Sequence, residues 1–302
     1  MRAIAFVMAA HRTSSDSSGD GALGIIAGRG LLPVQLARAC QRNGRDCFII
    51  GLEGEADSAI EDFAHEWATL GQFAHIGDRL LAAGCAELVV IGAIKRPDLG
   101  AVSFDEGGLW FLDWVSKQTL AADAAGNRGD DALLRGVVAY FEHRQLPVIA
   151  PEAVLASLLA PEGAQTNHAH NAHFDDITRA RLVAQEIGRL DIGQSVIVCR
   201  GLVLGVEGPE GTDALLQRVG QLPEGLRGTP QQRAGVLAKF PKPQQERRID
   251  LPTLGVPTIE GAAAANLAGI VYEAGGALFD DAEAMAARAE ELGLFLVGMA
   301  AL

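Results

Sequence analysis

In the first half of the chain, starting at Leu23, short apolar runs alternate with stretches whose apolar residues recur at helical spacing. The pattern predicts strands at Leu23–Ala27, Asp46–Gly51, Glu87–Ile91 and Pro147–Ala150, and helices at Leu31–Arg42, Ile76–Ala83 and Asp130–Arg144. Continuous apolar strands that alternate with helices are typical of a parallel sheet covered on both faces. The first half therefore predicts a Rossmann-like α/β domain.

The pattern changes after about Pro151. Two predicted strands, Gln194–Cys199 and Leu202–Glu207, are separated only by Arg200-Gly201, which indicates a hairpin. Later strands are predicted at Ala268–Tyr272 and Leu294–Val297, with a helix at Ala282–Glu291 between them. We therefore expect an N-terminal domain over 22–152, a linker over 153–165 and a C-terminal mixed α/β domain over 166–302.

Residues 1–21 precede this pattern. Their apolar run, Ala3–Ala10, is far shorter than the roughly 20 residues that cross a bilayer, and it leads into the polar stretch His11–Asp20. We expect a disordered leader or a non-native start, with an export signal as the alternative.

Composition narrows the class of protein. The 302 residues include 25 basic and 38 acidic side chains, a net charge of −13, which argues against a nucleic-acid partner. The four cysteines, Cys40, Cys47, Cys85 and Cys199, form no CxxC pair. We interpret them as reduced thiols of a cytoplasmic protein.

A glycine turn, Gly28-Arg29-Gly30, follows the first predicted strand and opens a helix. Such turns let a backbone approach phosphate, and the helix N-terminus favours an anion. Pro33 stands where a dinucleotide fingerprint has a third small residue, although Glu53 has the place of a ribose-binding acid. The turn indicates either a phosphate or sugar-nucleotide contact or tight packing.

Three histidines, His168, His170 and His173, precede Asp175 and Asp176. Their spacing matches no familiar zinc site, so we favour a solvated linker in which one of the aspartates caps the following helix.

The segment Arg227–Arg248 carries six basic residues against one acid, Glu246, a net +5. Pro241 and Pro243 predict a rigid, extended strand, which leads to Asp250. Such a strand is either a solvated face or a site for a diphosphate with a divalent cation.

An acidic element, Glu207–Asp213, follows a predicted strand. Thr212 and Asp213 are suited to cap the next helix. Asp213, together with Glu207, is equally suited to bind magnesium, which takes one or two carboxylates and keeps several waters.

Six segments together resemble, in order, the LpxI-type UDP-2,3-diacylglucosamine pyrophosphatases. They are Leu23–Pro33, Gly92–Pro97, Gly129–Arg135, Leu190–Gln194, Glu207–Asp213 and Lys239–Thr253. The resemblance covers residue 23 to the C-terminus. It implies two α/β domains with a site in the cleft between them, and magnesium-dependent hydrolysis that yields UMP and 2,3-diacylglucosamine 1-phosphate in lipid A synthesis.

With this resemblance, we expect Asp250 first and Asp213 second as the catalytic carboxylate, and Asp250, Asp213 and Glu207 as magnesium ligands. The expected substrate-binding residues are Gly28, Arg29, Gly30, Arg96, Asp130, Asp131, Thr212, Lys239, Lys242, Gln244, Arg247, Arg248 and Thr253. A nucleotide-dependent oxidoreductase and a non-catalytic sugar-nucleotide or lipid carrier are the alternatives. Trp110 and Trp114 either line an acyl groove or pack in the core.

The lipid substrate implies transient contact with the cytoplasmic face of the inner membrane, and a homodimer is a further expectation.

Overall fold

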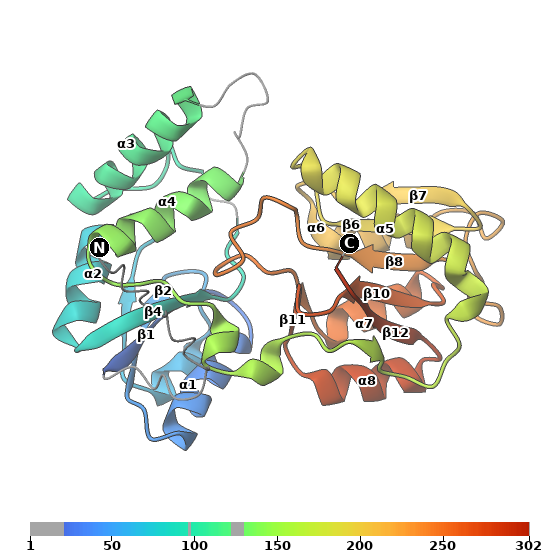
Figure 1. The fold of residues 1–302 in the computed structure, drawn as a ribbon, viewed down its shortest axis with the longest axis horizontal. Coiled ribbons are helices and arrows are strands. Elements are labelled where there is room, and N and C mark those ends of the chain that lie inside the picture. The colour runs from blue at the N-terminus through green and yellow to red at the C-terminus, as the bar shows by residue number, and fades with distance from the viewer. Residues whose placement is uncertain (1–20, 96–97, 122–129, 302) are drawn as a thin grey trace, which may run out of the picture.

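A computed structural model describes residues 21–95, 98–121 and 130–301, without the side chains of 119–121 and 130. Most of the predicted leader and Arg96 lie outside the described residues. The chain forms two α/β lobes that lie side by side (Figure 1). No helix in the described part of the chain combines the length and the hydropathy that crossing a membrane requires.

The N-terminal lobe is built on a four-stranded parallel sheet in the order β3-β2-β1-β4. Its strands are β1 (Ala22–Ala27), β2 (Cys47–Leu52), β3 (His65–Ala68) and β4 (Cys85–Ile91). Its helices are α1 (Leu32–Arg42), α2 (Phe73–Ala82), α3 (Glu106–Ala121) and α4 (Asp130–His143), with a 3-10 turn η1 (Ser58–Asp62). The predicted Rossmann-like parallel sheet is confirmed.

The predicted strand at Pro147–Ala150 is wrong. Only one bridge, between Leu88 and Val148, joins this segment to β4. The Leu88 amide donates to the Pro147 carbonyl, and the Ile149 amide donates to the Leu88 carbonyl. Pro147 has no N–H of its own to extend the ladder.

The C-terminal lobe contains a six-stranded mixed sheet in the order β5-β12-β10-β8-β6-β7. Its strands are β5 (Gly163–Ala164), β6 (Ser195–Cys199), β7 (Leu202–Val206), β8 (Val236–Lys239), β10 (Gly269–Glu273) and β12 (Phe295–Met299). The helices are α5 (Phe174–Arg189), α6 (Gly211–Gly220), α7 (Val256–Ala264) and α8 (Ala282–Glu291), with a short turn η4 (Asn171–His173). Two earlier short turns, η2 (Pro151–Ala153) and η3 (Ala156–Leu158), pack against the N-terminal lobe. The predicted hairpin at Arg200-Gly201 is confirmed, because β6 and β7 pair antiparallel around it.

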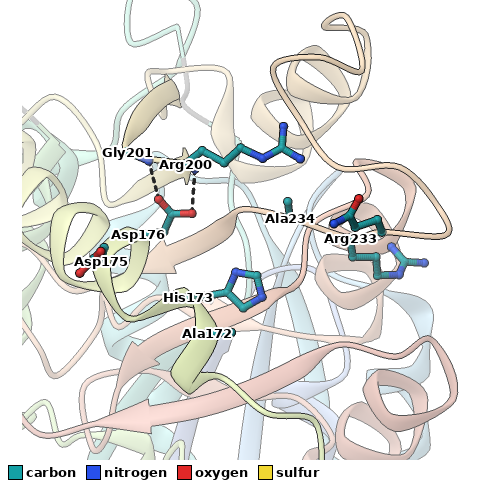
Figure 2. Close-up of a pocket in the computed structure, with 9 residues that line it drawn as sticks. Ala172, His173, Asp175, Asp176, Arg200, Gly201, Arg233 and Ala234 are labelled. Carbon is teal, nitrogen blue, oxygen red and sulfur yellow. Dashed lines mark hydrogen bonds between the residues drawn. The ribbon is translucent and has the colours of Figure 1, made fainter.

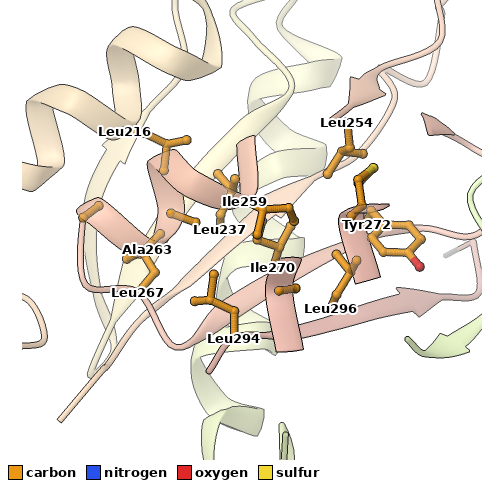
Figure 3. Close-up of a cluster of buried hydrophobic side chains, with 14 of the residues drawn as sticks. Leu216, Leu237, Leu254, Ile259, Ala263, Leu267, Ile270, Tyr272, Leu294 and Leu296 are labelled. Atoms are coloured by element: carbon orange, nitrogen blue, oxygen red, sulfur yellow. The ribbon is translucent and has the colours of Figure 1, made fainter. Parts of the chain in front are cut away.

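Each lobe has its own apolar core. Leu237, Ile270 and Leu296 of adjacent strands pack with Ile259 of α7 on one face of the C-terminal sheet (Figure 3). In the N-terminal lobe, Trp110 stacks on His143 and packs against the core at Phe111 and Tyr140. The packing interpretation therefore describes Trp110 better than an open acyl groove.

The segment between β8 and β9 (Thr253–Leu254) joins the lobes (Figure 1). Ile249 and Leu251 leave the C-terminal lobe and pack against apolar clusters of the N-terminal one. β9 pairs with β11 (Leu278–Phe279), and Leu278 joins the same N-terminal cluster as Leu251. Residues that belong to the C-terminal lobe by sequence are thereby held on the N-terminal lobe.

The expected extended basic strand is wrong beyond Lys239. β8 ends there, and the segment then folds into turns, with Gln245 N donating to the Lys242 carbonyl and Asp250 N donating to the Glu246 carbonyl. The Gln245 side chain also accepts from the Lys242 amide. These local hydrogen bonds outweigh the preference of the prolines for extended backbone.

Candidate functional site

Five of the predicted residues lie together at the C-terminal end of β8: Glu207, Thr212, Asp213, Lys239 and Thr253. Lys239 is the last residue of this strand; it lies opposite Ser195 of β6 and beside Tyr272 of β10. Its side chain is buried, and Nζ donates to the Thr253 carbonyl over 2.9 Å. Lys239 therefore ties the end of β8 to the start of β9.

A chain of three buried side chains lies beside this lysine. The Thr212 hydroxyl donates to Glu207 Oε1 over 3.0 Å, and the Ser195 and Thr212 hydroxyl oxygens are 3.1 Å apart. The second carboxylate oxygen, Glu207 Oε2, is buried and has no hydrogen-bond partner among the residues that the structure describes. A buried carboxylate oxygen without a partner is unusual in a native fold.

The charges of Lys239 and the acidic element act on each other. Burial lowers the pKa of Lys239, because an ammonium loses its hydration, and the nearby Glu207 and Asp213 carboxylates counter that effect. Glu207, Thr212, Asp213, Lys239 and Thr253, predicted separately along the sequence, thus form one cluster.

The helix cap predicted for Thr212 or Asp213 is wrong. Glu210 is the N-cap of α6, and both residues lie within the first turn of the helix. Thr212 uses its hydroxyl for Glu207, and Asp213 remains exposed. The turn Gly208–Glu210 brings α6 back onto the end of β7, which places the acidic element against β8.

Asp250 lies on the joining segment, between Ile249 and Leu251, whose side chains are held by the N-terminal lobe. Three residues later, Thr253 accepts the hydrogen bond of Lys239. Asp250 is half-buried. Its backbone therefore runs from one lobe to the Lys239 cluster.

The remaining predicted cations form ion pairs. Lys242 pairs with Asp191 at 2.6 Å, and Arg247 pairs with the buried Glu273 at 3.0 Å. Arg248 pairs with Glu246 within its own segment and with Glu142 of the N-terminal lobe. Acids far away in the sequence thus neutralise much of the +5 segment.

Asp131 anchors the joining segment to α4. It is 2% exposed, accepts from the Glu246 amide over 3.1 Å and pairs with Arg135 at 2.8 Å. Arg135 also donates to the Gln244 carbonyl. The predicted residues Asp131 and Gln244 therefore meet at the contact between the lobes, while the side chain of Asp130 lies outside the described residues.

The glycine turn of the N-terminal lobe packs closely and is already hydrogen-bonded. A Cβ on Gly28 would come within 2.7 Å of the Ala93 carbonyl oxygen. Gly30, with φ of +104°, donates its amide to Asp57 Oδ2 over 2.6 Å, and Arg29 pairs with Glu55. The close approach of Gly28 to Ala93 agrees with the packing interpretation, while the contact to a phosphate or sugar nucleotide stays a prediction.

The histidine segment lies elsewhere. His173 lines a cavity of about 470 Å³ with Arg200 and Arg233 (Figure 2). Asp176 accepts from the Arg200 and Gly201 amides over 2.8 and 2.7 Å, while His173 is the N-cap of α5, so the predicted aspartate cap is wrong. This cavity adjoins the start of β8, whereas Lys239 ends that strand.

Within residues 21–95, 98–121 and 130–301, no group of three or more His, Cys, Asp or Glu side chains is placed to hold a metal ion. Magnesium suits a sparser site, with one or two carboxylates and the substrate's own phosphates. Glu207, with its unpartnered Oε2, and the neighbouring Asp213 fit that description.

Ser195 is the member of the cluster that sequence reasoning missed. Its hydroxyl is fully buried at the start of β6, in the otherwise apolar run Ser195–Cys199. The available signal was one polar residue at the start of a continuous apolar strand, and by itself this position does not point to a function.

Comparisons with known proteins agree with the two-lobe structure. The family model of the LpxI N-terminal domain matches residues 22–158, and that of the LpxI C-terminal domain matches residues 161–297. UDP-2,3-diacylglucosamine pyrophosphatase LpxI of Caulobacter vibrioides is 45% identical over 279 residues, which cover 92% of this chain and 97% of that protein. On these matches, the chain belongs to the LpxI family.

Proposed function

We propose that this protein hydrolyses the diphosphate bond of UDP-2,3-diacylglucosamine to UMP and 2,3-diacylglucosamine 1-phosphate, a step of lipid A biosynthesis. The observation that carries the proposal is the 45% identity, over nearly the full length of both chains, to a protein named for that activity. The Lys239 cluster supports it, because a buried cation beside carboxylates suits a diphosphate and its counter-ion.

Magnesium is the proposed cofactor, with Glu207, Asp213 and Asp250 as ligands. When bound, it would supply Lewis-acid stabilisation of phosphate oxygens and a template for an attacking water. Two of these carboxylates lie at the Lys239 cluster, and the joining segment carries the third.

The protein's own groups bind and orient the diphosphate in this proposal. Lys239, fixed by Thr253, offers a charged donor whose position is set by β8 and β9. A rigid, buried donor costs little reorganisation when charge develops on the phosphate. Asp250 holds or activates the water, and the attack takes place at the phosphorus nearer the sugar.

The acyl chains remain near the membrane surface in this proposal, so the protein contacts the inner membrane only transiently. Two exposed apolar side chains, Leu31 and Ile94, support this. Leu31 follows the glycine turn and Ile94 follows Ala93, and a β-bridge between Arg29 and Ala93 joins these two segments. Each buried methylene contributes about 0.8 kcal/mol, so even partial burial of an acyl chain on such residues aids binding.

The test is to incubate the pure protein with UDP-2,3-diacylglucosamine and Mg²⁺, with and without a chelator, and to measure UMP. We expect release with Mg²⁺ and none with the chelator. Hydrolysis in ¹⁸O-labelled water then identifies the attacked phosphorus, with label expected in the lipid 1-phosphate. Bound but intact substrate would favour a carrier and overturn the proposal.

A further inference from the structure

We propose that Ser195 is a positioning residue for this reaction, acting on Glu207 through Thr212. The inference rests on the proposed function and extends it to a residue that does not touch the substrate. Two contacts and one further observation carry it: the 3.1 Å approach of the two hydroxyls, the 3.0 Å bond from Thr212 to Glu207, and the burial of all three side chains.

The direction of these hydrogen bonds follows from counting protons. Glu207 Oε1 lies 3.0 Å from the Thr212 hydroxyl and is the acceptor of this hydrogen bond. Thr212 has one hydroxyl proton and donates it to Glu207 Oε1. The Thr212 oxygen must then accept from Ser195, since the threonine has no second proton.

The backbone holds Ser195 in register for this role. Ser195 lies directly opposite Lys239 in the antiparallel pair of β6 and β8, so both side chains project from the same face of the sheet. The carbonyl of Ser195 accepts from the Glu207 amide over 2.8 Å. One residue thus fixes the main chain of Glu207 directly and its side chain through Thr212.

The chain of hydrogen bonds keeps the second carboxylate oxygen, Glu207 Oε2, free to bind a ligand. With Oε1 occupied by Thr212, Glu207 cannot rotate without losing a buried hydrogen bond, so Oε2 stays available. A buried carboxylate oxygen without a partner is costly, and its cost is recovered when a cation or donor arrives with the substrate. Without Ser195, Thr212 could turn and Glu207 could satisfy both oxygens elsewhere.

The experiment is a double-mutant cycle with Ser195→Ala, Thr212→Val and the pair combined, with Thr258→Val as a control at another buried hydroxyl of this lobe. We expect Ser195→Ala to lower kcat about tenfold and to change KM less than twofold. The combined variant should match Thr212→Val within about twofold in kcat, because Ser195 acts only through Thr212. The control should leave kcat unchanged.

A second arm does not depend on activity. The shifts in urea midpoint of Ser195→Ala and Thr212→Val should not add in the combined variant. Either substitution alone already breaks the chain of hydrogen bonds to which both side chains belong. Additive midpoints would show that the side chains are not coupled and would overturn the inference. If the wild-type protein releases UMP normally but the losses of kcat in Ser195→Ala and Thr212→Val add in the combined variant, the positioning role alone would be overturned. A wild-type protein that releases no UMP would overturn the proposed function and this inference with it.

Discussion

The Gly30 amide donates to the Asp57 carboxylate over 2.6 Å, so a carboxylate of the same lobe already holds the anion-binding amide of the glycine turn. Arg29, the neighbouring cation of the turn, is likewise paired with Glu55. A phosphate that binds at this turn must therefore compete with two acidic side chains that follow β2.

Asp57→Asn tests that competition. The neutral amide is a weaker acceptor and adds no charge, so we expect KM for UDP-2,3-diacylglucosamine to fall about threefold to tenfold with kcat unchanged. Steady-state kinetics measure this, with Asp62→Asn as a control on a nearby acid. An unchanged or higher KM would show that the turn serves packing rather than phosphate binding.

Asp250→Asn should lower kcat about 100-fold or more, because an amide neither holds a cation well nor accepts a proton from water. Asp213→Asn should have a smaller effect, about tenfold, since Asp213 is exposed and has Glu207 beside it. UMP release is measured on variants whose circular dichroism matches the wild type. Near-normal rates in both would contradict the assignment of these carboxylates.

Lys239→Met should destabilise the protein by about 2 kcal/mol, because it removes the charged hydrogen bond from Nζ to the Thr253 carbonyl and the cation that lies near Glu207 and Asp213. Urea unfolding measures the loss. Lys117→Met is the matched control: it breaks an exposed pair with Asp113 and should cost less than about 1 kcal/mol. Equal effects of the two substitutions would mean that Lys239 is not electrostatically coupled to the cluster.

The pH dependence of stability should include a contribution from Glu246. The hydrogen bond from Arg248 lowers the pKa of Glu246 below its ordinary value of 4.5. A carboxyl with a lowered folded-state pKa stabilises the fold above its unfolded-state pKa, and the stabilisation is lost as the pH falls through the folded-state value. Glu246→Gln should therefore destabilise the protein by about 1 kcal/mol at pH 7 and by much less at pH 3.

Unfolding of both proteins by urea at the two pH values checks this prediction, with Glu224→Gln as a control for the change in net charge. A difference between wild type and Glu246→Gln that is the same at pH 7 and pH 3 would contradict it.

Several strands and helices of the N-terminal lobe could be predicted from the sequence because their signal is local, whereas β3 and α3 were not predicted. In β1 and α1, for example, apolar spacing predicted the elements to within a residue or so of their observed ends. The segment after Lys239 shows the limit of such signals. Its prolines favoured an extended strand, but hydrogen bonds within the segment and contacts to α4 favoured turns.

The sequence by itself determined the two α/β lobes, many of their elements and the chemistry available in the acidic and basic segments. Only the tertiary structure decided which charges meet. It paired Lys242, Arg247 and Arg248 with acids distant in the chain and gathered Glu207, Thr212 and Lys239 around Ser195. The physical reason is that periodicity reports the face of an element that is buried, whereas the partner of a buried polar group depends on how several elements pack.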